Sequence, residues 1–388
     1  MIQRSLTEKL LHLSAKFPVV SLTGPRQSGK TTLLKMAFPN HKYASLEDPD
    51  TRIFAETDPR SFLNSGSKMI VDEIQRLPEL FSYIQSITDE SGIDGQFIIS
   101  GSQSFLLNDK ISQSLAGRVA VLNLLPLSIS EIQNHGFEIT TYEELLYKGF
   151  YPRLYDKNIE PEDFYPNYVQ TYIERDVRLL QNIQDLNQFV RFVKLCAGRI
   201  GQLLNLSSLA HDAGLSVNTA KAWLSVLEAS FIVFLLHPYH RNFNKRLVKM
   251  PKLYFYDPGL ASSLLEIHSV NQISTHYLTG PLFENLILAE LLKNRYHQGL
   301  RSNIFFWRDH RGSEIDCIIE DDKEIIPIEI KSSRTFSPEF FNGISYWGKI
   351  SGSVSNSRYV VYGGDESAET QYGKLVSWRN LTAISTGV

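Results

Sequence analysis

Cysteine is scarce in this chain of 388 residues, and long apolar runs are missing. The two cysteines, Cys196 and Cys317, stand far apart and form no CxxC pair, which argues against a disulfide framework and against a structural zinc site. A reducing, cytoplasmic setting is therefore expected. The longest apolar run, residues 231–236, is far shorter than the roughly 20 residues of a membrane helix, and the N-terminus has no apolar core typical of a signal peptide. No membrane partner is predicted.

An excess of charge of either sign is also absent. Lysine and arginine number 39 and aspartate and glutamate number 42, which leaves a net charge of -3. Any binding of DNA must then come from a local basic patch. A hydrophobic content of 43% is close to the globular average and excludes a disordered or fibrous chain, while 388 residues exceed what one hydrophobic core usually supports. Two or three domains are expected.

One motif near the N-terminus predicts a nucleotide site. A buried strand is expected over residues 17–22 and a helix from residue 31, and the pattern GxxxxGK[ST] stands between them. Its glycines let the backbone curl so that amide groups point at phosphate oxygens, and the helix N-terminus adds a positive dipole end. Lys30 is predicted to reach the β and γ phosphates of ATP, and Thr31 to offer a hydroxyl to Mg²⁺. The expected nucleotide contacts are Gly24, Pro25, Arg26, Gln27, Ser28, Gly29, Lys30, Thr31 and Thr32.

A second apolar strand, residues 68–71, ends in two adjacent acids. Asp72 is predicted to act on Mg²⁺, directly or through water, and Glu73 to polarise the water that attacks ATP. Adjacent acids after a strand can also be a solvated turn, but a complete phosphate-binding loop upstream favours the metal interpretation.

Two further positions are candidates for sensing or stabilising the γ-phosphate. Residues 97–103 read as a strand that ends in small polar residues, so Ser102 or Gln103 could contact the nucleotide, although an ordinary polar strand end explains them too. Arg118 is the candidate arginine finger, because a guanidinium stabilises charge on a transferring phosphoryl group. A plain surface arginine is the alternative.

Several segments together resemble one protein family. GPRQSGKT, MIVDEIQRLP, FIISGSQSFLL and SLAGRVAVLNLLPLS are similar to the AAA-type ATPase domain of bacterial and archaeal proteins that carry a C-terminal domain of unknown function, DUF4143. The resemblance continues in the same order through residues 172–177, 252–260, 283–285 and 328–331. It implies ATP binding on an α/β P-loop NTPase fold, and it implies no physiological role.

The middle of the chain is rich in aromatic residues between 142 and 180 but has no matching basic run. Base-stacking platforms combine aromatics with positive charge, so packing between domains is the preferred interpretation. Arg175 and Asp176 could contact the nucleotide or fix a hinge.

Residues 206–227 have the layout of a helix-turn-helix, in which Gly214 makes the turn and Ser216 caps the second helix. Residues 231–236 and the basic segment 241–249 could form the strands of a wing. Such a module can bind DNA or serve as a packing unit. The predicted DNA contacts are Asn218, Thr219 and Lys221 in the major groove and Arg241, Lys245, Arg246 and Lys249 on phosphates.

The last region resembles the PD-(D/E)xK nuclease fold, because a helix bearing Glu284 precedes strands that carry Asp316 and an ExK pattern. Residues two apart in a strand share a face, so Glu329 and Lys331 project together and Asp316 can join them from a neighbouring strand. Such a cluster would hold Mg²⁺ between Asp316 and Glu329, with Lys331 orienting water or stabilising the phosphate and Glu284 as an outer acid. The alternative is the solvated face of an amphipathic strand, and the fold alone does not imply cleavage.

The predicted fold class is α/β. A P-loop NTPase (AAA-like) domain is expected over residues 1–140, a helical lid or linker over 141–203, a winged-helix-like module over 204–250, and a restriction-endonuclease-like domain over 251–388. The predicted function is a Mg²⁺-dependent ATPase that couples its nucleotide state, ATP or ADP, to a DNA-binding or nuclease-like C-terminal domain. The alternative is a nucleotide-dependent switch or scaffold that binds DNA or protein without cleavage, or assembles with copies of itself so that Arg118 completes a neighbour's site.

Overall fold

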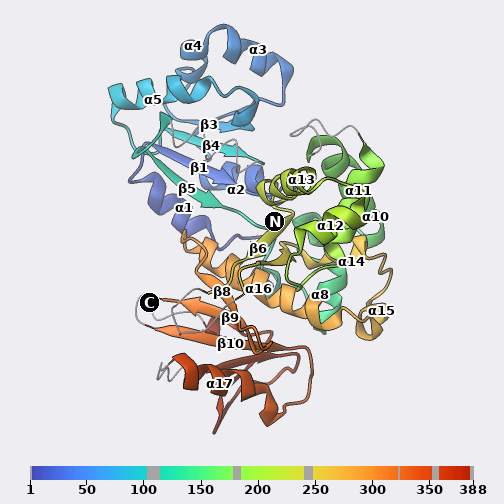
Figure 1. Ribbon diagram of the computed structural model, residues 1–388. Helices are drawn as coiled ribbons and strands as arrows, with labels where there is room; N and C mark the ends of the chain where they lie inside the picture. The colour runs from blue at the N-terminus through green and yellow to red at the C-terminus, as the bar shows by residue number, and fades with distance from the viewer. Residues whose placement is uncertain are drawn as a thin grey trace.

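The computed structural model describes residues 2–102, 114–177, 185–239, 248–321, 324–351 and 358–384 (Figure 1). The predicted residues Gln103, Arg241, Lys245 and Arg246, and the side chains of Arg175 and Asp176, lie outside this description. A blue α/β unit occupies one end of the molecule and an orange to red unit the other, with a group of helices beside them. Within the described ranges, no helix is long and apolar enough to cross a membrane.

The N-terminal unit is built on a parallel sheet in the order β2-β3-β4-β1-β5. Val19 packs on one face of this sheet, whereas its neighbour Val20 packs on the other, as strand geometry requires. Helices cover both faces, so the predicted α/β class is confirmed. The strands are β1 (Val19–Thr23), β2 (Lys42–Ser45), β3 (Met69–Asp72), β4 (Phe97–Gly101) and β5 (Val119–Asn123). The helices are α1 (Thr7–Ser14) and α2 (Lys30–Ala37) on one face, and α3 (Pro49–Thr57), α4 (Pro59–Leu63) and α5 (Leu80–Ser91) on the other.

The helical region after β5 buries the aromatic residues that the sequence gathers there. Tyr151, Tyr165 and Tyr168 are each no more than 1% exposed, and the rings of Tyr151 and Tyr168 lie 4.8 Å apart. Buried rings cannot stack on bases, so the packing interpretation is confirmed. The elements are α7 (Ile129–Asn134), α8 (Tyr142–Lys148), α9 (Pro152–Asp156), α10 (Pro161–Tyr168) and the π-helical segment η2 (Val169–Val177).

A helix-turn-helix comes next along the chain. It is formed by α12 (Leu206–Ala213) and α13 (Val217–Ala229) and follows α11 (Leu186–Ala197). Gly214 makes the turn with φ +71°, and the Ser216 hydroxyl accepts a hydrogen bond from the Thr219 amide at 3.1 Å, both as predicted. The two-stranded antiparallel sheet beside it pairs β6 (Val233–Leu236) with β7 (Lys252–Phe255).

The predicted wing strand over residues 241–249 lies largely outside the described residues. Within them, the partner of β6 is β7, all four residues of which are buried. Leu253 and Phe255 of this strand join the hydrophobic core. The pairing also joins residues on both sides of the predicted domain boundary at residue 250.

The C-terminal unit is a six-stranded sheet in the order β12-β13-β11-β10-β9-β8. Ile328 of β10 packs toward α16 and Ile325 of the same strand packs toward α17, so the sheet is covered on both faces. The strands are β8 (Ile304–Arg308), β9 (Glu314–Glu320), β10 (Ile325–Lys331), β11 (Tyr359–Tyr362), β12 (Ala368–Thr370) and β13 (Gly373–Ser377), and the helices are α14 (Pro258–Leu264), α15 (Val270–Thr275), α16 (Thr279–His297) and α17 (Asn342–Ser351).

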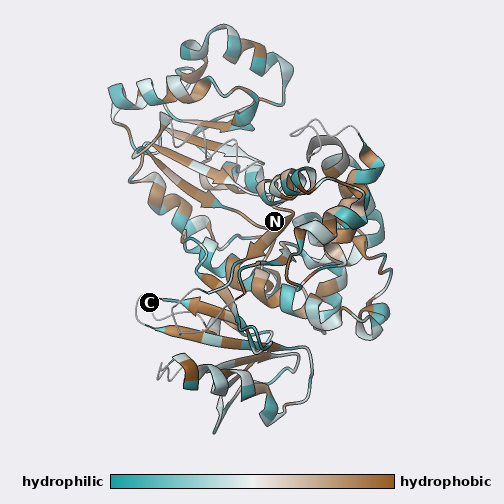
Figure 2. Cartoon of the chain, viewed as in Figure 1, coloured by the Kyte–Doolittle hydropathy of each residue, from teal (hydrophilic) through white to brown (hydrophobic). Residues whose placement is uncertain are grey.

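Helix α16 lies between the two large sheets and touches β5 of the first and β10 of the second. Most of its residues from Leu282 to Lys293 are buried, including Glu290 and Lys293. Figure 2 shows the same trend for the molecule, with brown apolar strands inside and teal polar residues on the outer helices. A helix that is buried on all sides fixes the position of whatever side chains project from it.

Candidate functional site

The phosphate-binding loop leaves the carboxyl end of β1 and enters α2 with backbone conformations that need glycine. Gly24 has φ +152°, and a Cβ atom on it would collide with the carbonyl oxygen of Leu124. Gly29 has φ +93° and precedes the first residue of α2. Both positions therefore exclude larger residues, because L-residues rarely adopt these angles.

Lys30 folds back into the loop that surrounds it. Its ammonium donates to the carbonyl oxygens of Gly24 at 2.8 Å and Pro25 at 2.7 Å, and the residue is 6% exposed. Burial lowers the pKa of Lys30 to about 8, while the nearby Glu73 acts in the opposite direction. The Ser28 hydroxyl oxygen is buried and has no hydrogen-bond partner within the described part of the chain. A buried ammonium, an unpartnered hydroxyl and a helix N-terminus fit a phosphate group.

Asp72 lies beside this loop at the carboxyl end of β3. The Thr31 hydroxyl donates to its Oδ2 atom at 2.7 Å, and the Tyr43 hydroxyl donates to the same atom at 2.9 Å. On its other oxygen, Oδ1, it accepts from the Ser100 hydroxyl at 2.5 Å. The structure thus brings together Thr31 and Asp72, the two residues predicted to hold Mg²⁺. Sequence reasoning missed Tyr43 and Ser100, because only the strand order β2-β3-β4 places them on either side of β3.

Glu73 follows Asp72 with a left-handed backbone, φ 56°, that turns its side chain toward the loop. Its carboxylate accepts hydrogen bonds from the side-chain amide of Gln75 at 2.5 Å and from the Ser102 hydroxyl at 3.3 Å. Burial raises the pKa of Glu73, with Lys30 opposing the shift. Ser102 therefore lies next to the predicted water-polarising residue.

A cavity of about 1100 Å³ opens in front of the loop. Lys30, Thr31 and Glu73 form its polar side, and residues from three other elements complete the wall. Pro152 of α9 lies 3.8 Å from the position of a Cβ atom on Gly29, so α9 abuts the loop. The remaining lining residues include Arg26, Gln27, Gly29 and Thr32 of the loop region, the apolar residues Ile2, Leu11 and Met36, and Arg153, Lys157 and Tyr172 of the helical region.

Arg153 is a residue that sequence reasoning missed, because nothing in the aromatic stretch distinguishes it from a surface arginine. Arg26 lies in the loop as predicted, with its guanidinium 2.8 Å from Glu47 and 5.9 Å from the ring centre of Tyr172. The cavity is lined by five basic side chains, Arg4, Arg26, Lys30, Arg153 and Lys157, against three acidic ones, Glu47, Glu73 and Asp156, which leaves an excess of positive charge. This charge suits a nucleotide polyphosphate.

Arg118 lies at the amino end of the strands, whereas the loop lies at their carboxyl end. Its carbonyl oxygen accepts from the amide of Val19, the first residue of β1, whereas the loop follows the last residue of that strand. Its guanidinium pairs with both carboxylate oxygens of Asp89, at 2.5 and 3.0 Å. Arg118 is therefore not an arginine finger for the loop of its own chain, and a role in a neighbour's site stays a prediction.

Arg4 connects the loop to the rest of the molecule. Its guanidinium donates to the Ser28 carbonyl oxygen at 2.6 Å and to the Glu131 carboxylate at 3.1 Å, and the residue is 6% exposed. Glu131 lies 3.7 Å from His297 at the end of α16. On the same helix, Lys293 donates to the Leu127 carbonyl oxygen at 2.8 Å. Buried polar contacts thus run from the phosphate-binding loop to α16.

The residues predicted for the nuclease-like site also meet. The Lys331 ammonium lies 2.6 Å from Glu329 and 3.2 Å from Asp316. The pairing of β9 with β10 ends at Cys317 and Ile328, and beyond it the Asp316 carboxylate accepts a hydrogen bond from the Ile330 backbone amide at 2.8 Å. Glu329 is only 5% exposed, so the solvated-strand alternative is wrong for it.

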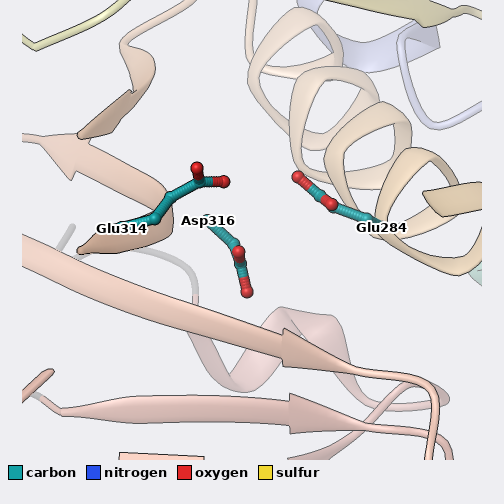
Figure 3. A group of neighbouring side chains, drawn as sticks. All are labelled: Glu284, Glu314 and Asp316. Atoms are coloured by element: carbon teal, nitrogen blue, oxygen red, sulfur yellow. The ribbon is translucent and has the colours of Figure 1, made fainter. Parts of the chain in front are cut away.

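Glu284 joins this cluster from α16, and a further acid, Glu314, completes it. Oxygen atoms of Glu284, Glu314 and Asp316 all lie within 4.8 Å of one another, and Figure 3 shows Glu284 facing the strand that carries the other two. Glu314 is two residues from Asp316, so strand alternation could have predicted it. Burial raises the pKa of Glu284 to about 7 against the opposing effect of Lys252, and burial raises that of Glu329 to about 8.

Lys252 of β7 lies among these acids. Its ammonium is 3.0 Å from Glu284 and also contacts Glu314, and its side chain is 4% exposed. The three carboxylates are close enough to share one cation, but two of them already pair with this lysine. The arrangement fits a divalent metal only after Lys252 leaves.

Three segments of this chain are similar to known protein families. Residues 16–133 match the family model of an AAA domain. Residues 279–381 match a domain of unknown function, DUF4143, and residues 139–271 match another, DUF8612. The resemblance to an AAA-type ATPase domain followed by DUF4143 is therefore confirmed. The DUF8612 match spans both the predicted lid and the predicted winged-helix module, and the DUF4143 match starts with α16 and not at residue 251.

Relatives along most of the chain include uncharacterized proteins of Mycobacterium tuberculosis and Mycobacterium bovis, each 29% identical over 340 residues that cover 86% of this chain and 74% of the relative. An uncharacterized protein of Haemophilus influenzae is 22% identical over 80% of this chain and 81% of its own length. Among solved structures, a Walker-type ATPase of Pyrococcus abyssi has a TM-score of 0.45 at 14% identity, covering 68% of this chain and 96% of its own. AMPPCP-bound DnaA from Aquifex aeolicus has a TM-score of 0.31 at 14% identity, covering 58% and 86%.

Proposed function

We propose that this protein is a Mg²⁺-dependent ATPase whose nucleotide state is transmitted to its C-terminal unit. The observation that carries the proposal is the meeting of Lys30, Thr31, Asp72 and Glu73 at one edge of a parallel sheet, beside a cavity of about 1100 Å³. Ligands of doubly wound sheets bind at this carboxyl edge. The AAA domain match over residues 16–133 supports the same conclusion.

Each residue has a chemical task in this proposal. Lys30 and the amides at the start of α2 bind the phosphates, and Arg153 adds positive charge from α9. Thr31 and Asp72 hold Mg²⁺, which when bound polarises the phosphoryl oxygens. Glu73 orients the attacking water, and its raised pKa suits a group that accepts a proton.

Helix α16 is the element that supports coupling between the two units. Glu284 projects into the acidic cluster, whereas Glu290 accepts from the Ile129 amide at 2.9 Å and Lys293 donates to Leu127 just after β5. Arg4 binds both the phosphate-binding loop and Glu131 in the same neighbourhood. A movement of the loop on nucleotide binding would therefore displace groups that hold α16.

ATP hydrolysis by the full chain, measured with and without double-stranded DNA, tests the proposal. We expect Lys30→Ala to lose nucleotide binding, and Glu73→Gln to keep binding but to hydrolyse about a hundredfold more slowly or worse. Lys16→Ala, an exposed lysine outside the cavity, is the matched control. Hydrolysis by Lys30→Ala at the wild-type rate would contradict the proposal. Stimulation by DNA would favour a DNA-processing role.

A second candidate is a nucleotide-dependent switch that binds DNA or protein without cleaving it. The observation that favours it is the pairing of Lys252 with Glu284 and Glu314, which fills the acidic cluster. Incubation of nucleic acid with the protein and Mg²⁺ or Mn²⁺ tests whether the C-terminal unit cleaves nucleic acid or only binds a partner. Cleavage that Asp316→Ala and Lys331→Ala abolish supports a nuclease, whereas a nucleotide-dependent change in partner affinity without cleavage supports the switch.

A further inference from the structure

The acidic cluster of the C-terminal unit contains an ammonium group that comes from outside the DUF4143 match. Lys252 belongs to β7, which lies in the region of the DUF8612 match, and its side chain is 4% exposed. A buried ammonium is unfavourable unless acids surround it. Here it pairs with Glu284 at 3.0 Å and with Glu314.

The backbone of β7 is held by the middle region. The Gly201 amide donates to the Leu253 carbonyl oxygen at 2.9 Å, and the Leu204 amide donates to that of Pro251 at 2.8 Å. On its other side β7 pairs with β6 through four residue pairs, one of which joins Leu236 to Lys252. The Phe255 amide also donates to the side-chain oxygen of Asn285 on α16 at 2.7 Å. The segment after α11, β6 and α16 therefore together set the position of the ammonium.

A metal ion and this ammonium compete for the same oxygen atoms. Glu284, Glu314 and Asp316 offer oxygens within 4.8 Å of one another, and Lys252 contacts the first two acids. Two positive charges a few ångströms apart in a buried site repel strongly. Two further cations neutralise these acids without a metal. Arg308 lies 3.1 Å from Glu314, and Lys331 lies 3.2 Å from Asp316.

We infer that Lys252 is a tethered counter-ion that closes the acidic cluster to divalent metal, and that β7 must withdraw it before a metal binds. This inference goes beyond the proposed function, which places its metal at Thr31 and Asp72, and concerns a second metal site in the C-terminal unit. Since β7 is held by the middle region, a rearrangement there would open or close the cluster. The cluster then binds metal in one conformation only.

Binding of Mn²⁺ alone, measured by calorimetry on the full chain without nucleotide, tests the inference. Lys252→Met removes the charge and keeps a long apolar stem, and we expect its Mn²⁺ affinity to exceed the wild-type value by about tenfold or more. Adding Asp316→Asn to this variant should abolish the gain, which locates it in the cluster. Lys349→Met, an exposed lysine of α17, should bind like the wild type. Equal Mn²⁺ affinity in folded Lys252→Met and wild type would overturn the inference.

A second measurement on the wild-type chain decides the question if Lys252→Met does not fold. The rate of amine acetylation at Lys252, followed by mass spectrometry, should rise severalfold on titration with Mn²⁺, while that at Lys349 stays constant. Mn²⁺ bound at the cluster with no change at Lys252 would overturn the inference. If Mn²⁺-loaded Lys252→Met does not cleave nucleic acid, a nuclease role is contradicted and the inference about Lys252 stands. The proposed ATP hydrolysis takes place at the separate phosphate-binding loop, so the ATPase assay tests this activity independently.

Discussion

At the scale of residues, the nucleotide site depends on hydroxyl groups as much as on charges. Thr31, Tyr43 and Ser100 all donate to Asp72, which is only 4% exposed. A buried carboxylate is unfavourable without such donors. The three hydroxyls therefore position Asp72 beside the loop.

Arg153 provides a test at this scale. Arg153→Ala removes a positive charge from the cavity wall next to Pro152, and we expect the Kd for ATP to rise about tenfold, the loss of one charged contact to phosphate. Titration with a fluorescent ATP analogue measures this. Arg191→Ala, an exposed arginine of α11, serves as the control. An unchanged Kd would show that Arg153 does not contact the nucleotide.

At the scale of elements, α13 shows how one helix can combine a buried and an exposed role. Trp223 is 7% exposed and meets the rings of Phe189 and Phe192 edge-on, at 5.3 and 5.6 Å. Asn218 and Lys221 on the same helix are exposed. The tryptophan anchors the helix-turn-helix, and the polar face of the helix is exposed.

Substitutions on α13 separate these roles. Trp223→Ala should lower the free energy of unfolding of the helical region by about 3–5 kcal/mol, because a large ring leaves a cavity in a packed core. Lys221→Ala should change it by no more than about 0.5 kcal/mol. Urea unfolding followed by far-ultraviolet circular dichroism measures both. If Lys221→Ala also leaves DNA affinity unchanged, the major-groove prediction for this helix is wrong.

At the scale of the whole molecule, the contact between the N-terminal unit and α16 contains two titrating groups. Arg4 and His297 hold the pKa of Glu131 down, to about 2, although burial acts to raise it. Burial lowers the pKa of His297 to about 4, although Glu131 lies 3.7 Å away and acts to raise it. Burial outweighs the single acid, so His297 is neutral at pH 7.

This contact should weaken as the pH falls. The folded pKa of His297 lies below its ordinary value of 6.5, so the unfolded chain binds a proton first and stability is lost as the pH falls from about 6.5 to 4. Glu131 adds a further loss of stability once the pH falls below 4.5, the ordinary pKa of its carboxyl group, toward its folded pKa of about 2. His297→Gln should remove up to about 3 kcal/mol of this pH dependence between pH 6.5 and 4, measured by urea unfolding. If the free energy of unfolding depends on pH with the same slope in wild type and variant, the assignment of this pH dependence to His297 is wrong.

The sequence by itself determined the parts of this protein in which neighbouring residues do the chemistry. Residues 24–31 need only a curled backbone before a helix, so their pattern predicted the loop, and Gly214 with Ser216 predicted the turn and cap of the helix-turn-helix. Alternation along β10 likewise predicted that Glu329 and Lys331 share a face.

Only the tertiary structure decided which distant residues meet. The strand order set Tyr43 and Ser100 against Asp72. The parallel direction of β1 and β5 placed Arg118 at the opposite end of the strands from the loop. The pairing of β6 with β7 brought Lys252 into the acidic cluster, a contact that the sequence pattern did not predict. Local patterns depend on backbone geometry over a few residues, whereas these contacts depend on the burial of apolar surfaces over the whole chain.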